Sequence, residues 1–315
     1  MPEPTDLLLI THNRLGYVQK TLPALLADSD DYRIFWWDNA STDGTLEYID
    51  SLGDPRLAVK HHAKENSGQE EAMLWFLNVS MSETLGKIDD DVLLPPGWCK
   101  RLSTMIQSSK RFGMLACWLF MQEDWDEKLA RRRAIRVADY SVLRAVVVQG
   151  QACVARREVM QAYLKPGSPG LPINQYQMSR DGLINGMPLP AIFAHNMDDP
   201  RSPHYLTRNG QQGAPMGLTA RRLGFQTHEE YACWIAADAM QRLKLPFSIQ
   251  MAIEASYRRR GITGRLLRRL ARPFIPTLGL VNPEPIARRT AEQSDEAQAP
   301  TNNQDRIHPN SKNLG

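Results

Sequence analysis

Compact apolar runs alternate with longer amphipathic stretches over the first 120 residues of the chain. The runs have the length of strands, and the stretches between them have the length and spacing of helices. Such a succession is typical of a mostly parallel sheet that is buried between helices, so we predict an α/β fold. The expected strands are 7–13, 32–37, 57–61, 84–88 and 113–120, and the expected helices are 14–26, 42–52, 96–108 and one that begins near Ser67.

The stretch S-G-Q-E at 67–70 has the pattern of a capping box. The Ser67 side chain would accept a hydrogen bond from a free N–H group of the first turn, and the Glu70 side chain would accept one from the backbone N–H of Ser67.

The second half of the chain is less regular. It contains a charged stretch that we expect to be solvated (122–136) and a helix (228–243). Between them, residues 164–215 are rich in Pro, Gly, Asn and Asp, and we expect long loops around short elements there. Loops of that length are typical of binding or lid segments.

The chain has 315 residues, of which 42% are hydrophobic, so it can bury a substantial core as one large or two small domains. Its four cysteines are widely spaced without a C-x-x-C pair, which favours neither a disulfide framework nor a structural zinc site. A reducing, cytoplasmic setting fits best. The N-terminus lacks the features of a secretory signal, and no window approaches about 18 uninterrupted apolar residues.

The charge is unevenly distributed. Lys and Arg outnumber Asp and Glu by 38 to 35, yet residues 258–272 contain seven arginines and no acid, which leaves about −4 on the rest of the chain. On a helix, this segment gathers its leucines largely on one side. Such a basic amphipathic helix suits peripheral contact with an anionic membrane surface; the alternative is a solvated helix that packs its leucines on the rest of the protein. We expect residues 283–315 to form a disordered tail.

Polar clusters follow three of the expected strands: Thr11-His12-Asn13-Arg14, Asp38-Asn39-Ala40-Ser41 and Asp89-Asp90-Asp91. Ligands of open α/β sheets bind outside the carboxyl ends of the strands. Three consecutive carboxylates repel one another, and Mg²⁺ or Mn²⁺ prefers oxygen ligands of this kind together with substrate phosphates. The alternative for this triplet is an exposed acidic turn.

Two common phosphate-binding motifs are absent from the sequence. It has no G-x-x-x-x-G-K-[ST] and no G-x-G-x-x-G after a strand, so neither a P-loop enzyme nor a nicotinamide-binding domain is supported. What remains is a nucleotide-diphosphate site in which a metal ion, rather than a glycine loop, neutralises the phosphates.

Four ordered motifs, LLLITHNR, DNASTDGT, ENSGQEEAM and KIDDDVLLPPGW, resemble the family 2 glycosyltransferases of the GT-A fold over residues 7–98. The resemblance continues through QGQACVARREV (149–159) to about His195. It implies a Rossmann-like sheet, a catalytic domain at 1–245 and a C-terminal helical extension at 246–282. Residues 1–120 would form the nucleotide-sugar half of that domain and 121–245 the acceptor-side half.

The resemblance also assigns residues. Thr11 and Asp38 would face the nucleobase of the donor, with Asp38 accepting a hydrogen bond from the ring N–H. Asp91 would ligate the metal, and Asp89 would contact the metal and the ribose or sugar hydroxyls. The remaining donor contacts implied are Asn13, Arg14, Asn66, Gly68 and Asp90. Asn39, Ser41 and Asp43 either assist there or only shape the turn and cap the next helix.

The reaction implied is transfer of a sugar from a nucleotide-diphosphate donor, with UDP as the default nucleotide, to a glycan or lipid-linked acceptor in polysaccharide biosynthesis. An inverting enzyme needs a carboxylate as general base. Members of the family commonly place it in an E-D pair at the start of a helix, and this sequence lacks the pair. Asp181 is our candidate, against a role in capping a short helix that begins there; Asp198 and Asp199 are the next candidates.

His195 follows the apolar run AIFA, where the resemblance implies a further metal ligand or a diphosphate contact; a structural histidine is the alternative. We expect Gly150 and Gln151 either beside the sugar or as residues that only pack in the core.

We expect a cytoplasmic protein, with the arginine segment as the candidate contact with the inner face of the cell membrane, and no nucleic-acid partner. The competing functions are an inactive GT-A-like nucleotide-binding protein and a nucleic-acid-binding module that uses the arginine segment.

Overall fold

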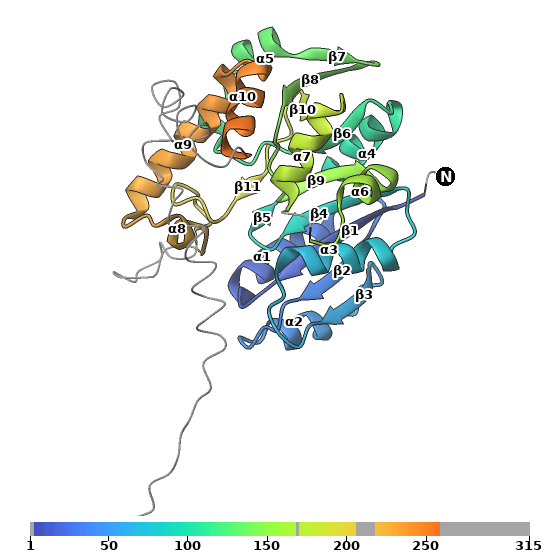
Figure 1. The fold of residues 1–315 in the computed structure, drawn as a ribbon. Coiled ribbons are helices and arrows are strands. Elements are labelled where there is room, and N and C mark those ends of the chain that lie inside the picture. Colours follow the sequence, from blue (N-terminus) through green and yellow to red (C-terminus); the bar gives the residue numbers. More distant parts are fainter. Residues whose placement is uncertain (1–2, 168–169, 206–217, 259–315) are drawn as a thin grey trace, which may run out of the picture.

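The computed structural model describes residues 3–167, 170–205 and 218–258. Within them, nine strands form one sheet in the order β3-β2-β1-β4-β9-β6-β10-β8-β7, and two short strands, β5 and β11, form a second (Figure 1). The strands are β1 Thr5–Thr11, β2 Tyr32–Asp38, β3 Leu57–His62, β4 Thr84–Asp89, β5 Val92–Leu93, β6 Phe112–Ala116, β7 Ile135–Val137, β8 Tyr140–Ala145, β9 Ala152–Arg156, β10 Ile184–Leu189 and β11 His195–Asn196. The helices are α1 Leu15–Ala27, α2 Thr45–Ser51, α3 Gly68–Val79, α4 Trp98–Ser108, α5 Glu127–Arg133, α6 Arg157–Tyr163, α7 Leu171–Arg180, α8 Leu218–Leu223, α9 His228–Lys244 and α10 Phe247–Arg258, with a 3-10 turn, η1, at Gln122–Asp124.

The predicted α/β fold with a mostly parallel sheet is confirmed. Strands β3, β2, β1 and β4 are parallel neighbours, and β6 and β10 pair in parallel farther along the sheet. Strand β9 runs the opposite way between β4 and β6, and β8 runs opposite to β10. The parallel strands place their carboxyl ends at one edge of the sheet, where Thr11 is level with Asp38 and Ile10 with Asp89.

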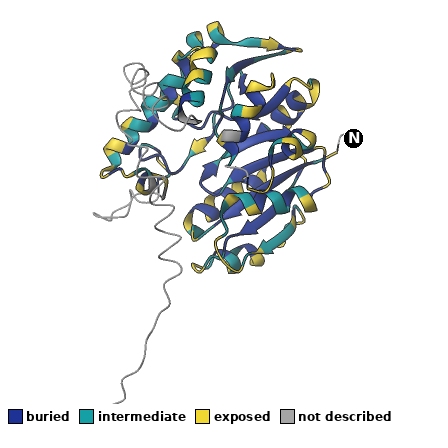
Figure 2. Ribbon diagram, viewed as in Figure 1, coloured by how far each residue is buried: buried dark blue, intermediate teal, exposed yellow. Residues whose placement is uncertain are grey.

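The sheet is buried on both faces. Because side chains alternate along a strand, Leu7 and Leu9 of β1 join one core with α1, α2 and α4, whereas Leu8 and Ile10 join a second core with α3, α6 and α9. Figure 2 shows the central strands as the buried layer and the helices with exposed outer faces. The continuous apolar run of the first strand is the consequence of this two-sided burial.

The predicted helix near Ser67 is confirmed as α3, but the capping box is wrong. The Ser67 side chain makes no capping hydrogen bond and lies 3.4 Å from Asn39 Oδ1. Glu70 Oε1 instead accepts a hydrogen bond from Gly167 N at 2.6 Å. The Ser67 and Glu70 side chains therefore bond to residues that are distant in sequence instead of to the first turn of α3.

Residues 122–136 are solvated, as predicted, in most of their charged side chains, which are exposed, but the stretch also packs on the rest of the protein. They contain η1 and α5, in which Ala130 is fully buried, and Arg133 of α5 donates to the carbonyl of Arg242 at the end of α9, 2.9 Å away. In the described part of 164–215, the predicted loops around short elements are confirmed, and the elements are α7, β10 and β11.

Helix α10 begins in the predicted extension 246–282 and lies against the sheet. Gln250 accepts a hydrogen bond from Val146 N at 3.1 Å and donates one to Leu245 O at 2.9 Å. The rest of the predicted basic helix, from residue 259 on, and the predicted tail at 283–315 lie outside the described residues. None of the described helices has both the length and the apolar character that crossing a membrane requires.

Candidate functional site

The carboxyl ends of β1 and β2 are joined by a buried hydrogen-bond network around Asp38. Asp38 Oδ1 accepts from the hydroxyls of Thr11 at 2.9 Å and Ser41 at 2.5 Å, and Asp38 Oδ2 accepts from Ser41 N at 2.9 Å. Trp36 Nε1 donates to Thr11 Oγ1 at 2.9 Å. Thr11 and Asp38 are each 1% exposed. This edge of the sheet is therefore rigid before any ligand binds.

The turns that follow these strands are shaped by their own polar side chains. Asn13 has a left-handed backbone (φ 50°), and its Oδ1 accepts from Thr42 N at 2.7 Å. Asp43 Oδ2 accepts from Leu15 N at 2.8 Å, so it caps the start of α1 from across the sheet edge. Burial acts to raise the pKa of Asp43. Hydrogen bonds from Thr45 and Leu15 outweigh this effect and keep the pKa below its ordinary value. Asn13 and Asp43 thus have the turn-shaping role, which leaves their contact with a ligand as a prediction.

Arg14 lies between three nearly buried carboxylates. Its Nη1 is 2.8 Å from Asp91 Oδ2 and 3.4 Å from Asp90 Oδ1, and its Nη2 is 3.0 Å from Asp198 Oδ1. Tyr17 donates its hydroxyl to the same oxygen of Asp198 at 3.3 Å. The structure therefore joins Asp198, from the loop after β11, to the acidic triplet more than 100 residues away. We call Arg14, Asp90, Asp91 and Asp198 the acidic cluster.

Among the described residues, the acidic cluster is short of positive charge, because one guanidinium faces three carboxylates. Burial raises the pKa of Asp91 to about 6 against the opposing effect of Arg14, and it raises the pKa of Asp90 well above its ordinary value. Burial acts to lower the pKa of Arg14, but the three carboxylates raise it overall. Such a site gains stability by taking up either protons or a cation.

A buried lysine accompanies Asp89. Lys87 Nζ forms an ion pair with Asp89 and donates to Gly150 O at 3.2 Å, and its side chain is 4% exposed. Asp89 is the more accessible partner, at 18%. Lys87 is a functional candidate that the sequence reasoning missed; the signal was a lysine in the middle of the otherwise apolar run TLGKI.

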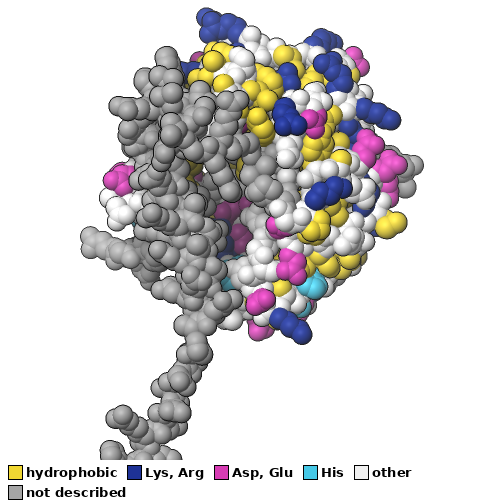
Figure 3. Space-filling model, viewed as in Figure 1, with side chains coloured by type: hydrophobic (Ala, Val, Ile, Leu, Met, Phe, Trp, Pro, Cys, Tyr) yellow, Lys and Arg dark blue, Asp and Glu magenta, His cyan; other side chains and the backbone are white. Residues whose placement is uncertain are grey.

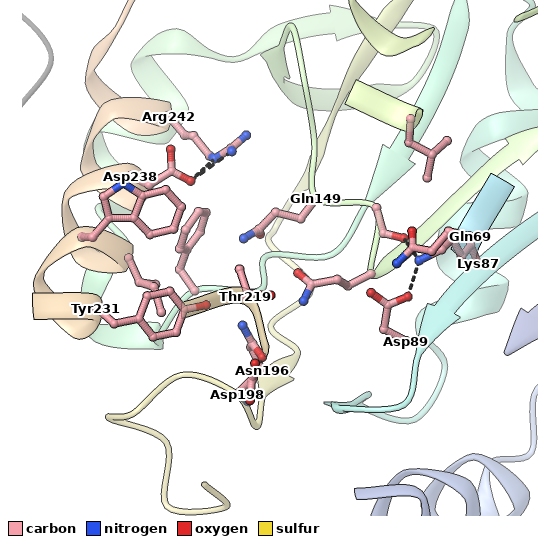
Figure 4. Close-up of a pocket in the computed structure, with 16 residues that line it drawn as sticks. Gln69, Lys87, Asp89, Gln149, Asn196, Asp198, Thr219, Tyr231, Asp238 and Arg242 are labelled. Carbon is pink, nitrogen blue, oxygen red and sulfur yellow. Dashed lines mark hydrogen bonds and ion pairs between the residues drawn. The ribbon is translucent and has the colours of Figure 1, made fainter. Parts of the chain in front are cut away.

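Beside this edge lies a cavity of about 330 Å³, which we call the first cavity. Figure 4 shows Lys87 and Asp89 on one side of it, Tyr231, Asp238 and Arg242 of α9 on the other, and Asn196 and Asp198 between them. Its lining is Gln69, Lys87, Asp89, Phe120, Gln149, Gly150, Gln151, Leu171, Asn196, Asp198, Thr219, Tyr231, Trp234, Ile235, Asp238 and Arg242. Acidic side chains are visible inside the hollow at the middle of the face drawn in Figure 3. Gly150 and Gln151 line this cavity, and their expected position beside the sugar stays a prediction.

Asp181 is placed away from the first cavity, which corrects its assignment as the general base. It follows the last residue of α7 instead of starting a helix, is about half exposed, and accepts from the Tyr163 hydroxyl at 3.0 Å. It precedes β10, whose first residue Ile184 is level with Phe112 at the start of β6. Asp181 therefore lies at the amino edge of the sheet, opposite the acidic cluster.

Helix α7 is the element in which the family pattern expects the base, and its first turn carries no acidic residue. Among the other sequence candidates, Asp199 is 1% exposed and held by Arg201 at 2.7 Å. Asp198 lines the first cavity and Asp238 lines it from α9. Sequence reasoning did not select Asp238, because nothing local distinguishes it from any charged residue of an exposed helix.

The other predicted residues lie near this edge. His195 is exposed on β11, which pairs with β5 just after Asp91, and its ring centroid is 5.9 Å from that of His204. Asn66 Oδ1 accepts from Gly68 N at 3.2 Å, and Gly68, with φ 80°, starts α3 and accepts from Asn39 Nδ2 at 3.3 Å. These contacts shape the loop before α3 and leave the predicted donor contacts untested.

A divalent ion fits the acidic cluster in one respect. Asp91 Oδ1 is buried and has no hydrogen-bond partner among the described residues. No group of three or more His, Cys, Asp or Glu side chains in the described ranges is arranged to hold a metal by itself. Mg²⁺ commonly takes one or two protein carboxylates and completes its shell with substrate phosphates and water. Asp91 and Asp89 suit such a site, in which the substrate supplies the remaining ligands.

Comparisons with known proteins relate the chain to a family and to a fold. The family model of glycosyl transferase family 2 matches residues 6–159. The mannosyltransferase PcManGT from Pyrobaculum calidifontis, solved in complex with GDP-Man and Mn²⁺, is 16% identical with a TM-score of 0.53, over 89% of this chain and 85% of that chain. S. aureus TarS in complex with UDP-GlcNAc is 13% identical with a TM-score of 0.49, over 94% and 92%. No protein of curated function matches the sequence. At these identities the structural likeness concerns the fold.

Proposed function

Since the chain belongs to the family 2 glycosyltransferases and has the GT-A fold, we propose that it transfers a sugar from a nucleotide-diphosphate donor to a hydroxyl group of a glycan or glycolipid. The observation that carries this proposal is the convergence of three polar strand ends on one sheet edge beside a cavity. Asp89 lines that cavity directly, and Arg14 joins Asp91 to Asp198, which lines it too.

The donor would lie along this edge. We assign its nucleoside to the turn of Thr11 and Asp38, which is pre-formed by hydrogen bonds, and its diphosphate to the edge formed by Asp89 and Asp91. Lys87 and Arg14 hold the two carboxylates in place before the donor binds. Asn13, Asn66, Gly68 and Asp90 are our further candidates for donor contacts, on the resemblance alone. UDP remains the default nucleotide, and GDP is the alternative that the donor of PcManGT suggests.

We propose that Asp91 and Asp89 hold Mn²⁺ or Mg²⁺, with His195 as a further candidate ligand. When bound, such an ion supplies a Lewis acid for the departing diphosphate. The chain contributes the unpartnered oxygen of Asp91 and the excess negative charge of the acidic cluster. This charge attracts a cation and would repel the diphosphate without one.

For an inverting reaction, we propose Asp198 as the general base. Its carboxylate faces the first cavity and is tied through Arg14 to Asp91, so it lies where an acceptor hydroxyl meets the donor sugar. Tyr17 and Arg14 both bind Oδ1, which fixes the orientation of the carboxylate. A base held in this way removes the proton from the acceptor hydroxyl as the new glycosidic bond forms.

A second candidate function is supported by the missing acid in the first turn of α7. A chain without a base would bind a nucleotide sugar and transfer nothing. A role in polysaccharide or glycolipid synthesis at the inner face of the membrane is a further proposal, whose basis, the arginine segment, is outside the described residues.

The test measures binding and hydrolysis of UDP-GlcNAc and GDP-mannose by the full chain with Mn²⁺. We expect binding and slow hydrolysis, in which water replaces the acceptor. Asp198→Asn should lower hydrolysis by about 10²–10⁴, the usual contribution of a general base, without loss of binding. Asp181→Asn is the matched control and should hydrolyse the donor at the wild-type rate.

Each other outcome has a definite meaning. Wild-type hydrolysis by Asp198→Asn rejects Asp198 as the base. Donor binding without hydrolysis by the wild-type chain supports the nucleotide-binding alternative. Failure to bind either nucleotide sugar rejects both functions.

A further inference from the structure

A second cavity, of about 270 Å³, lies between α9, α10 and the segment after β8. Its lining is Val146, Val147, Pro172, Asp238, Gln241, Arg242, Leu245, Gln250, Ile253 and Glu254. Asp238 and Arg242 also line the first cavity. The two cavities therefore adjoin at this pair of residues, on the side of the first cavity that is opposite Lys87 and Asp89 (Figure 4).

The ion pair at the junction is held in one orientation. Asp238 Oδ2 accepts from Arg242 Nε at 3.1 Å and from Nη2 at 3.0 Å, and Arg242 Nη1 donates to Val147 O at 2.6 Å. Asp238 Oδ1 has no hydrogen-bond partner among the described residues, and the two side chains are 23% and 22% exposed. The junction thus presents an oriented carboxylate oxygen to a ligand, together with guanidinium N–H groups that these three bonds do not use.

Size and chemistry both point to an extended ligand. Small-molecule sites commonly measure about 300–1,000 Å³; each cavity alone lies near the lower limit, and the two together fall well inside the range. The second cavity combines amide and charged side chains with apolar ones such as Val147, Leu245 and Ile253. Hydroxyl groups suit the polar side chains, and the C–H faces of a pyranose suit the apolar ones.

We propose that the acceptor is an oligosaccharide of at least two sugars that occupies both cavities. The sugar that receives the new linkage lies in the first cavity, the preceding sugar lies in the second, and Asp238 and Arg242 bind hydroxyl groups where the two meet. This proposal rests on the proposed glycosyltransferase function and adds its acceptor class.

Helix α10 offers a matched pair of substitutions. Ile253→Trp adds bulk to the lining of the second cavity and leaves the first cavity unchanged. Ile249→Trp makes the same change one turn earlier on the same helix, at an exposed side chain that lines neither cavity. Both variants retain Gln250, which fastens α10 to the sheet.

The test measures direct binding of the full chain, with Mn²⁺ and UDP or GDP present, to a glycan array of neutral and uronic-acid-containing saccharides of one to six sugars. We expect binding to saccharides of two sugars or more and weaker binding to monosaccharides. Ile253→Trp should weaken it by at least about tenfold, or about 1.4 kcal/mol, and Ile249→Trp should bind like the wild-type chain.

Three outcomes would each overturn the proposal: monosaccharides that bind as tightly as longer saccharides, equal binding by the two tryptophan variants, and the absence of any glycan binding. Calorimetric binding of UDP-GlcNAc or GDP-mannose in the same samples tests the proposed function separately. Its failure would reject that function, whereas donor binding without the expected glycan pattern rejects the acceptor assignment alone.

Discussion

Replacement of Arg14 by Met gives the most informative test of the acidic cluster. Met keeps much of the length and apolar stem of the side chain but removes the one cation that Asp90, Asp91 and Asp198 share. We expect the variant to be less stable than the wild-type chain without divalent ions and to regain most of that loss with Mn²⁺, because the ion replaces the missing positive charge.

The magnitude follows from burial. Removing one partner of a buried ion pair costs about 3–5 kcal/mol. Because the Arg14 side chain is 22% exposed whereas its partners are 4–6% exposed, we expect the lower value, about 3 kcal/mol at pH 7.5. At about 2–4 °C per kcal/mol for a domain of this size, the midpoint of thermal unfolding should fall by roughly 6–12 °C.

The loss should shrink as the pH falls. Burial already raises the pKa of Asp91 to about 6 and that of Asp90 well above its ordinary value, and Arg14 opposes both shifts. Without Arg14 the two pKa values rise further, so at pH 5.5 the carboxylates take up protons and lose their repulsion. Urea unfolding followed by tryptophan fluorescence, at pH 5.5 and 7.5 and with or without Mn²⁺, measures these effects.

Arg33→Met is the control. Arg33 binds the fully buried Asp6 through Nε at 2.8 Å, near the start of β1 and away from the acidic cluster. Its removal should destabilise the chain without any rescue by Mn²⁺. A loss in Arg14→Met that is the same at both pH values and with or without the ion, or no loss at all, would refute the reasoning.

Three further predictions concern the same fold. In the wild-type chain without divalent ions, the free energy of unfolding should fall as the pH rises through about 6, because Asp91 holds its proton more tightly when folded. Urea titrations of Asp91→Asn should show a weaker pH dependence of this free energy, and a pH dependence identical to that of the wild-type chain would contradict the prediction. The exposed Cys233 should be the one thiol that reacts with a thiol reagent in the native protein, because the other three cysteines are buried and the pKa values of their thiols are raised. Rapid reaction of a second thiol would contradict this prediction. Gly186→Ala should cost about 1–3 kcal/mol in chemical unfolding, since its Cβ would lie 2.4 Å from Val142 Cγ1, whereas Gly53→Ala meets nothing within 4 Å; equal stabilities would reject this account of packing.

The sheet edge that we propose for the donor was predictable from the sequence because it depends on local patterns. Apolar runs mark buried strands, and parallel strands must end at one edge, so Thr11, Asp38 and Asp89 had to lie near one another. The same logic identified Asp91. No contact between distant segments was needed for these predictions.

The acceptor side was not predictable in the same way. The acid expected at the start of a helix was assigned to Asp181, but α7 starts ten residues earlier and Asp181 follows its end. The sequence placed Asp198 only second and did not indicate Asp238, because both reach the first cavity through loop and helix packing over long sequence separations, which no local pattern encodes. Ser67 illustrates the same limit, since a partner 28 residues away replaces its capping role.

The most direct test of the central claim is calorimetric titration of the full chain with GDP-mannose and with UDP-GlcNAc, in the presence of Mn²⁺ and in the presence of a chelator. We predict that at least one of the two donors binds with Mn²⁺, that the chelator weakens this binding by at least about tenfold, and that Asp91→Asn weakens it to a similar extent. Affinity that is unchanged by the chelator and by Asp91→Asn, or no binding of either donor, would contradict the assignment of this sheet edge as a metal-assisted nucleotide-sugar site.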